Sequence, residues 1–291
     1  MPARETLGLI LGLIGVTIFA ATLPMTRLAV GDLGPWFLAM GRAAGAGLIA
    51  LTVILFLRRP RPNTVQLAQL AVAALLLVGG FSALSGLALQ TLPAAHGGVV
   101  SGILPIATVA AATQISGERP SRAFWGCAIS GATLVAAFVL RTGAGSVSRG
   151  DLLLLGAVAS AALGYAISGK LSRTMPGWEV SSWTVIIALP VTLPCAIWLA
   201  PAYPGLVPPA SWGAFAYLAI MSMYLGFFAW NTGLAMGGVA HVAQVQLLQP
   251  FLTIGFAALL LGEKLEADTM AFAAAIVAII FVSRRLKVRA G

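Results

Sequence analysis

The chain alternates between long apolar stretches and short polar segments. Ten of the apolar stretches are close to the roughly 20 residues that a helix needs to cross the hydrocarbon core of a membrane. The segments between them are short, and none could hold a separate domain. We therefore predict ten membrane-spanning helices, spans 1 to 10, over Thr6–Val30, Pro35–Leu57, Val65–Leu89, Ala94–Ser116, Arg122–Leu140, Asp151–Leu171, Val180–Leu199, Ala210–Leu234, Val239–Leu261 and Ala267–Ser283.

Spans 4 and 9 open a segment that occurs twice in the chain. The first copy runs from Ala94 to Arg141, and the second begins at Val239. The offset between matching landmarks is 145 residues, half of the 291-residue chain to the nearest residue. The repeat is therefore a duplicated half-protein and not a solenoid unit of about 20 to 50 residues. The matching pairs are His96 and His241, Pro105 and Pro250, Thr108 and Thr253, Gly117 and Gly262, and Glu118 and Glu263.

The composition indicates a lipid environment. Charged residues make up 9% of the chain and apolar residues 59%, whereas soluble domains carry about 25% charged residues. The net charge of +9 comes from short basic clusters between the apolar stretches, which is typical of membrane topology signals and not of nucleic-acid binding. Cys127 and Cys195 lie within apolar stretches, where a thiol behaves as a small hydrophobic group; a disulfide or metal site has no support.

The distribution of Lys and Arg predicts the orientation, because cytoplasmic loops carry an excess of positive charge. With the N-terminus in the cytoplasm, 12 basic residues fall in cytoplasmic segments and 4 in outer segments. The outer four are Arg27, Arg141, Arg149 and Lys264, and Arg42 within span 2 completes the total of 17. We predict a multi-pass protein of the cytoplasmic (inner) membrane with both termini in the cytoplasm.

The repeat and the topology together predict the mechanism class. Five spans is an odd number, so residues 146–291 enter the membrane the opposite way up from residues 1–145. The predicted fold is all-α and polytopic, with two inverted five-helix repeats. Inverted repeats are typical of transporters, whose substrate sites lie near the membrane midplane between the halves. Exchange of conformation between the repeats gives inward-open and outward-open states.

The motifs resemble those of a known family. Spans 4 and 9 each contain a proline and end in Gly-Glu followed by Arg119 or Lys264, and a span rich in small residues follows each. Thr26-Arg27-Leu28 of span 1 corresponds to Gly169-Lys170-Leu171 of span 6, and Arg42 matches an arginine common in span 2. In these features the chain resembles the drug/metabolite transporter superfamily, EamA type. The segment 225–234, LGFFAWNTGL, is similar to span 8 of its aromatic amino-acid exporter (YddG-like) branch.

The resemblance implies two helix bundles around a central cavity and export of amino acids or other small metabolites. The aromatic branch often places aromatic residues beside the proline of span 4. Here the preceding residues are Ser101, Gly102, Ile103 and Leu104, which argues against a strict preference for aromatic substrates.

Pro105 and Pro250 each fall at the centre of a predicted span. A proline within a helix removes the hydrogen bond to the carbonyl four residues earlier, here that of Ser101 or Gln246. Such a carbonyl needs a partner or a wet cavity in the membrane. Ser101, Pro105, Gln246 and Pro250 are therefore candidate substrate-binding residues; the alternative is a kink with no ligand role.

Arg42 is the one basic residue deep in a span, and burial of its charge in lipid is costly. It could pair with a substrate carboxylate, or it could donate to carbonyls at helix ends. Other polar or aromatic residues within spans are candidates for the cavity, with helix–helix contact or an interfacial position as the alternative. They are Phe81, Ser82, Ser85, Tyr165, Ser168, Trp183, Tyr224, Trp230 and Asn231. Of these, Tyr165 and Asn231 are predicted to lie deepest.

His96 and His241 open spans 4 and 9. They could couple transport to protons, since histidine titrates near neutral pH, or they could bridge loops at the interface. All eight acidic residues lie at or beyond span ends, so we predict no mid-span carboxylate for proton or cation exchange. Glu118 and Glu263 are expected to accept from local loop donors, or to pair with Arg122 and Lys264.

The sequence thus predicts a transporter that exports amino acids or similar small metabolites by alternating access. We expect the transport to be facilitated diffusion. A drug or nucleoside-like metabolite exporter, with proton coupling, is the alternative within transport. A channel and an intramembrane enzyme are alternatives from other classes, but no catalytic motif is found. We expect a small-molecule substrate, a lipid bilayer, no nucleic acid, no cofactor and no metal, and a monomer or a dimer.

Overall fold

The protein's structure is a computed structural model that describes residues 2–115, 119–143, 145–201, 204–237, 243–284 and 288–289. The first half contains α1 (Pro2–Ala20), α2 (Thr22–Leu33), α3 (Pro35–Phe56), α4 (Thr64–Ala74), the π-helix η1 (Leu75–Ser82), α5 (Ala83–Ala88), α6 (Ala94–Ser101), α7 (Leu104–Ile115), strand β1 (Arg119–Pro120) and α8 (Arg122–Thr142). The second half contains α9 (Arg149–Leu171), α10 (Gly177–Trp198), the 3-10 turn η2 (Pro204–Leu206), α11 (Pro209–Ala216), the π-helix η3 (Tyr217–Leu225), α12 (Gly226–Gly237), the 3-10 turn η4 (Ala243–Leu248), α14 (Gln249–Leu261), α15 (Ala267–Arg284) and strand β2 (Val288–Arg289).

The helices confirm a membrane protein but not every predicted span. Among the described residues, seven helices are long and apolar enough to cross a membrane, or eight if the bent pair α6 and α7 is one span. α14 and α15 are shorter apolar helices. The start of span 9, residues 239–242, lies outside the described residues. Ten spans therefore remain a prediction.

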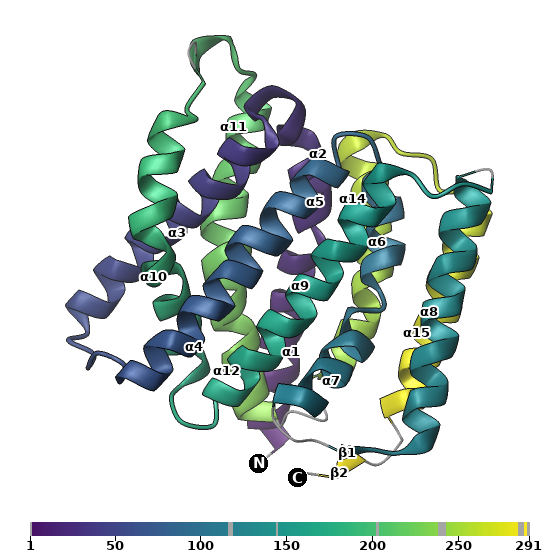
Figure 1. Cartoon of the computed structure of the whole chain (residues 1–291), viewed down its shortest axis with the longest axis horizontal. Coiled ribbons are helices and arrows are strands. Elements are labelled where there is room, and N and C mark those ends of the chain that lie inside the picture. Colours follow the sequence, from purple (N-terminus) through teal and green to yellow (C-terminus); the bar gives the residue numbers. More distant parts are fainter. Residues whose placement is uncertain are drawn as a thin grey trace.

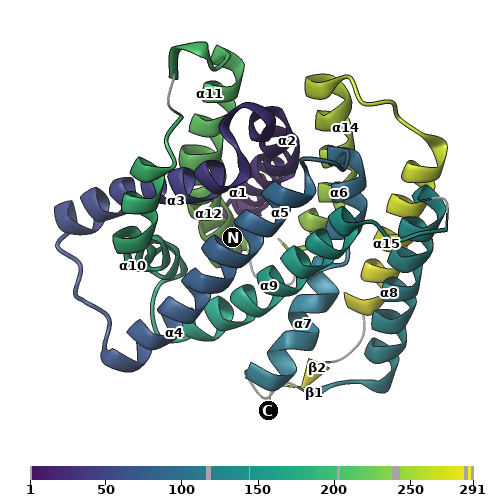
Figure 2. The same ribbon diagram turned by 45° about the horizontal axis from the view of Figure 1, so that its top comes forward.

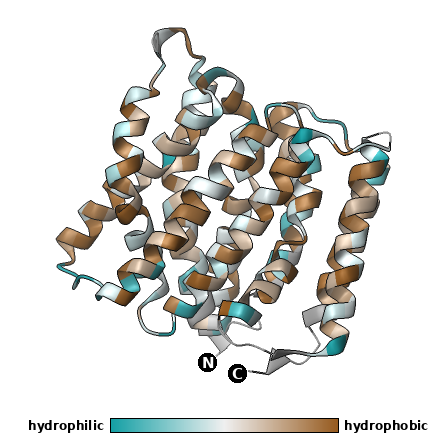
Figure 3. Ribbon diagram, in the orientation of Figure 1, coloured by the Kyte–Doolittle hydropathy of each residue, from teal (hydrophilic) through white to brown (hydrophobic). Residues whose placement is uncertain are grey.

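Hydrophobic residues cover most of the helix lengths, and hydrophilic residues concentrate toward helix ends and connections (Figure 3). Side chains at the starts of several helices explain these boundaries. Asn63 and Gln66 form a reciprocal capping box at the start of α4, and Ser148 and Asp151 form another at the start of α9. Such boxes satisfy backbone N–H groups that have no partner within the helix.

Several spans are interrupted within their length. Span 1 is divided into α1 and α2 at Ala21, and spans 3 and 8 each contain a π-helix, η1 and η3. π-helical turns are rare and often occur at functional sites. α6 and α7 are bent by 42° at the break between them. The two halves thus share a π-helix in the third element and a break in the fourth.

The helices of the two halves interlock in a symmetric pattern. α1 packs along α12, which joins spans 1 and 8, and α9 packs along η1 and α5, which joins spans 6 and 3. α3 packs with α10, α6 with α14, and α8 with α15; Figures 1 and 2 show this last pair side by side at one edge of the molecule. Under the sequence repeat, the contact between spans 1 and 8 corresponds to the contact between spans 6 and 3. Each of the other three contacts joins two spans that are equivalent to each other. These contacts therefore occur at positions that the sequence repeat makes equivalent, and the inverted relation of the halves remains a prediction.

Candidate functional site

The break in span 4 changes the predicted role of Pro105. α6 ends at Ser101, and α7 begins at Leu104 with Pro105 as its second residue. Span 4 is therefore bent by 42° at a break just before Pro105, and it is not one continuous helix with the proline inside it. In the first turn of a helix the N–H that proline lacks has no intrahelical partner in any case, so Pro105 favours a helix start here. The hydroxyl of Ser101 is buried and has no hydrogen-bond partner among the described residues.

Span 9 repeats this arrangement. The 3-10 turn η4 ends at Leu248, and α14 begins at Gln249 with Pro250 as its second residue. The starts of α7 and α14 are therefore separated by the 145-residue offset of the repeat. Pro250, like Pro105, begins a helix and does not kink one. Gln246 is half-buried within the turn that precedes α14.

The broken spans 4 and 9 cross each other closely at these points. A Cβ atom on Gly98 of α6 would lie 2.9 Å from Cγ2 of Thr253 on α14, and one on Gly102 would lie 3.5 Å from Cγ of Pro250. Thr253 also donates from Oγ1 to the carbonyl of Ala20, at the break in span 1, over 3.0 Å. Three interrupted helices thus meet in one place. The structure brings Pro250 beside the C-terminal end of α6.

A second group of predicted residues surrounds Arg42 on α3. The side chain is 3% exposed, and its Nη2 donates to Oγ of Ser82 over 2.6 Å. Ser82 ends the π-helix η1 and itself donates to the carbonyl of Leu77 over 3.1 Å. Tyr165 of α9 lies near Arg42 and interacts with it electrostatically. Ser85 donates to the carbonyl of Ser82 over 3.3 Å. The Nε atom of Arg42 is buried without a partner in the described chain.

The remaining predicted residues are divided between the core and the ends of the helices. Ser182 and Tyr224 lie 3.3 Å apart between their hydroxyl oxygens, and neighbouring Trp183 has a buried Nε1 with no partner among the described residues. Phe81 is half-buried on η1. Asn231 packs against Gly177, the first residue of α10. α12 thus brings Asn231 to the first residue of α10, and its place in a central cavity stays a prediction.

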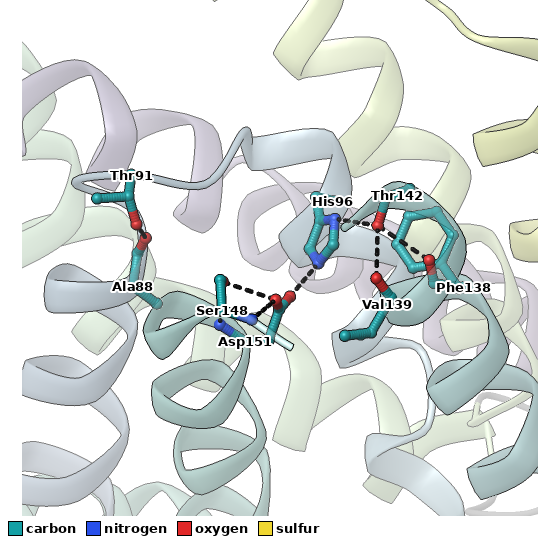
Figure 4. A network of polar contacts seen from close by, with 8 residues as sticks. All are labelled: Ala88, Thr91, His96, Phe138, Val139, Thr142, Ser148 and Asp151. Atoms are coloured by element: carbon teal, nitrogen blue, oxygen red, sulfur yellow. Dashed lines mark hydrogen bonds and ion pairs between the residues drawn. The ribbon is translucent and has the colours of Figure 1, made fainter. Parts of the chain in front are cut away.

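His96 forms a buried polar network at the start of α6 (Figure 4). Its Nε2 lies 2.8 Å from Oδ1 of Asp151, and its Nδ1 lies 3.4 Å from Oγ1 of Thr142. Asp151 is 2% exposed and also accepts from the N–H and hydroxyl of Ser148 over 2.9 and 2.6 Å. Because a carboxylate can only accept, Nε2 donates to it. The network joins α6 to α9; the equivalent His241 lies outside the described residues.

Glu263 holds the same end of α6 from the second half of the chain. Its two carboxylate oxygens accept from the N–H groups of Ala94 and Ala95 over 2.7 and 2.8 Å. The prediction of a local partner such as Lys264 is wrong, since the acceptor serves a helix about 170 residues away. A carboxylate is favoured there by both the free N–H groups and the helix dipole. Glu118, its counterpart in the first half, lies outside the described residues.

A pocket of about 530 Å³ opens beside Glu263 and is also lined by Arg27, Asp32 and Gln90. None of the predicted site residues lines it. Its charged side chains already have partners: Glu263 caps α6, Arg27 donates to the carbonyl of Leu89, and Asp32 accepts from Ser211. We therefore regard these side chains as parts of the helix connections.

Comparison with known proteins identifies the family. The pattern that defines the EamA-like transporter family matches the chain twice, over residues 6–141 and 148–285. The chain belongs to the EamA-like transporter family. The protein is therefore a multi-pass membrane transporter of the EamA type, in a family whose relatives are named as transporters and not as enzymes.

Individual relatives agree with this assignment. The chain is 40% identical to the "Uncharacterized transporter YdeK" of Bacillus subtilis (strain 168) over 282 residues, which cover 97% of this chain and 98% of the relative. It is 22% identical over 254 residues to "Uncharacterized transporter YyaM" of the same organism, which covers 83% of this chain and 82% of that one. One crystal structure matches with a TM-score of 0.65 and 18% identity, over 97% of this chain and 99% of the other. At that identity the likeness shows the fold alone.

Proposed function

We propose that this EamA-type transporter exports amino acids or similar small metabolites across the cytoplasmic membrane, by alternating access of two inverted five-span repeats, residues 1–145 and 146–291. The observation that carries the proposal is the matched break in spans 4 and 9. α7 and α14 begin at equivalent positions with a proline second, and α6 and α14 cross closely. Two elements of like sequence that pack across a two-fold can exchange conformations, as alternating access requires.

The proposed substrate site lies where these interrupted helices meet. Non-helical backbone at membrane depth is tolerated where it is buried in protein or lines a wet cavity. The buried hydroxyl of Ser101, which has no partner among the described residues, and the Gln246 amide supply polar groups beside the two breaks. We propose that a substrate donates to the backbone carbonyls near these breaks, and that Gln246 completes the contact.

Transport is proposed to be facilitated diffusion. All eight acidic residues lie at or beyond the predicted span ends, so a mid-membrane carboxylate that could exchange a proton for substrate is lacking. The buried Asp151 is engaged with His96 and Ser148 at the start of α9, which supports a role in joining the helices.

The test is counterflow in proteoliposomes with a panel of amino acids, nucleosides and cationic drugs. The proposal expects saturable counterflow of one or more amino acids or small metabolites. Counterflow of drugs or nucleosides alone would contradict the proposed amino-acid or metabolite substrates. Linear flux without counterflow would indicate a channel and contradict the proposed transport mechanism.

Two substitutions test the site. Gln246→Ala should lower transport severalfold to about tenfold, the loss expected for a hydrogen bond of roughly 1 kcal/mol or somewhat more, while folded protein is retained. Pro105→Ala supplies the N–H that proline lacks, which can donate to the carbonyl of Ser101; this should stiffen span 4 and slow exchange between conformations more than it weakens binding. Normal transport by both variants across the panel would place the site elsewhere.

A further inference from the structure

We infer that Arg42 binds a carboxylate group of the transported substrate. This inference rests on the proposed transport function and adds the chemical group that the substrate must carry. It starts from the cost of a guanidinium inside a membrane. Arg42 lies within α3, eight positions into a 22-residue helix, and is 3% exposed. A cation at such a position costs at least a few kcal/mol unless it is paired or hydrated.

Among the described residues, no carboxylate serves as a counter-ion for this cation. All eight acidic residues of the chain lie at or beyond the predicted span ends. Within the described chain, five of them already have partners elsewhere: Asp32 with Ser211, Asp151 with His96, Glu179 with Arg59, Glu263 with the start of α6, and Asp268 with Arg141. No ion pair of Arg42 occurs among the described residues.

The hydrogen bonds of Arg42 are also incomplete. Arginine has five N–H donors, and the structure gives this one a single hydrogen bond within the described residues, to Ser82. Its Nε is buried with no acceptor in the described chain. A guanidinium that served only to tie helices together would be expected to use these donors, because an unsatisfied buried donor costs about 1–3 kcal/mol. The unused donor is available to a ligand oxygen.

The neighbours of Arg42 fit this role. Ser82 ends the π-helix η1, where the i to i+5 pattern widens the helix, and Tyr165 adds a hydroxyl from α9 within electrostatic range. A planar carboxylate matches the two-pronged geometry of a guanidinium. The side chain is enclosed in this structure, so the inference requires that substrate reaches it in another conformation of the proposed alternating-access cycle.

The first test measures thermal stability without any ligand. The direction in which the unfolding midpoint changes distinguishes a substrate-binding role of Arg42 from a structural one. Arg42→Met keeps the side-chain length and removes the charge. Ser82 then still has its own hydrogen bond to the carbonyl of Leu77, so the substitution leaves no new unpaired group. If Arg42 serves the substrate, the thermal unfolding midpoint of the purified variant should stay equal to that of the wild type or rise. A clear fall in the midpoint would show a structural role and overturn the inference.

The second test compares carboxylates with their amides. Each L-amino acid of the proteoliposome panel is paired with its carboxamide, and each is measured as a competitor of counterflow. In the wild type the acid should compete at least roughly tenfold better than the amide, the factor expected for a charge-assisted hydrogen bond. Arg42→Met should lose this preference for the acid. Arg42→Lys keeps the positive charge but not the bidentate geometry of the guanidinium, so it should retain part of the preference.

Arg141→Met is the matched control, because Arg141 is an exposed arginine paired with Asp268 at a helix end. It should keep the preference for the acid. If the wild type treats acids and amides alike, the inference about Arg42 fails while export of small metabolites stands. If counterflow is limited to drugs or nucleosides without a carboxylate, both the inference and the proposed amino-acid substrates fail.

Discussion

Removal of the Glu263 carboxylate should destabilise the protein, because this side chain caps the start of α6. The side chain accepts two backbone hydrogen bonds, over 2.7 and 2.8 Å, from Ala94 and Ala95. Hydrogen bonds to a charged group contribute about 1.5–3 kcal/mol each, which sets a ceiling of roughly 3–6 kcal/mol for the pair. Ala94 is 0% exposed and Ala95 is 7% exposed. Water can therefore replace little of the hydrogen bonding that their N–H groups would lose. We expect Glu263→Ala to cost about 3–4 kcal/mol, in the lower part of this range.

The dependence of α6 on this cap follows from its own sequence. The residue before α6 is Pro93, and it provides no side-chain cap. Two of the eight residues of α6 are glycines, and glycine lowers helix stability by about 1 kcal/mol relative to alanine. Glu263→Gln retains one carbonyl oxygen and should therefore lose less than Glu263→Ala.

The assay is thermal unfolding of the purified variants in one detergent, with Glu266→Ala as the matched control. Glu266 lies three residues further on and is exposed. The expected order of midpoints is wild type, close to Glu266→Ala, then Glu263→Gln, then Glu263→Ala. Equal midpoints for Glu263→Ala and Glu266→Ala would refute the role assigned to the carboxylate.

Three further predictions concern topology, coupling and packing. Reporter fusions after Gly143 and after Gly291 should report opposite compartments; the same compartment for both would exclude the ten-span inverted arrangement. An imposed pH gradient should not drive uphill substrate accumulation in proteoliposomes; accumulation that His96→Ala abolishes would make His96 a proton carrier. Gly98→Ala should separate α6 from α14, because its Cβ would lie 2.9 Å from Thr253, at the roughly 1–3 kcal/mol typical of overpacking. Gly126→Ala on α8, with nothing within 4 Å of its Cβ, is the control and should be tolerated.

The positions of the helices could be predicted because apolar length is a local property of the sequence. α3, α8, α9 and α10 match the predicted spans within a few residues. The breaks were only partly predictable. Pro105 and Pro250 marked interruptions correctly, but whether a proline kinks a helix or begins one depends on the residues before it. In span 4, the break at Gly102 precedes the proline, and the sequence alone did not separate these cases.

The partners of the polar residues were harder to predict, since they lie far apart in the chain. The pairing of His96 with Asp151 joins residues 55 positions apart, and Asp151 looked like an ordinary residue at a span end. One signal was available: Ser148 and Asp151 have the spacing of a capping box, which fixes the carboxylate at the start of α9. For Glu263, the signal was the lack of a capping side chain before α6, because a helix without its own cap needs an acceptor from elsewhere.

These contacts indicate which part of the protein moves during the proposed transport cycle. α6 has eight residues, fewer than an isolated helix needs for stability in water, so tertiary contacts determine its structure. Its start is held by Glu263 and, through His96, by Asp151, both from the second half of the chain. Its end is separated from α7 by a 42° bend. A short helix with few local interactions and a hinge at one end can change position without unfolding a long span. The proposed alternating access should therefore involve α6 and its two carboxylate partners before the long helices α3, α8, α9 and α10.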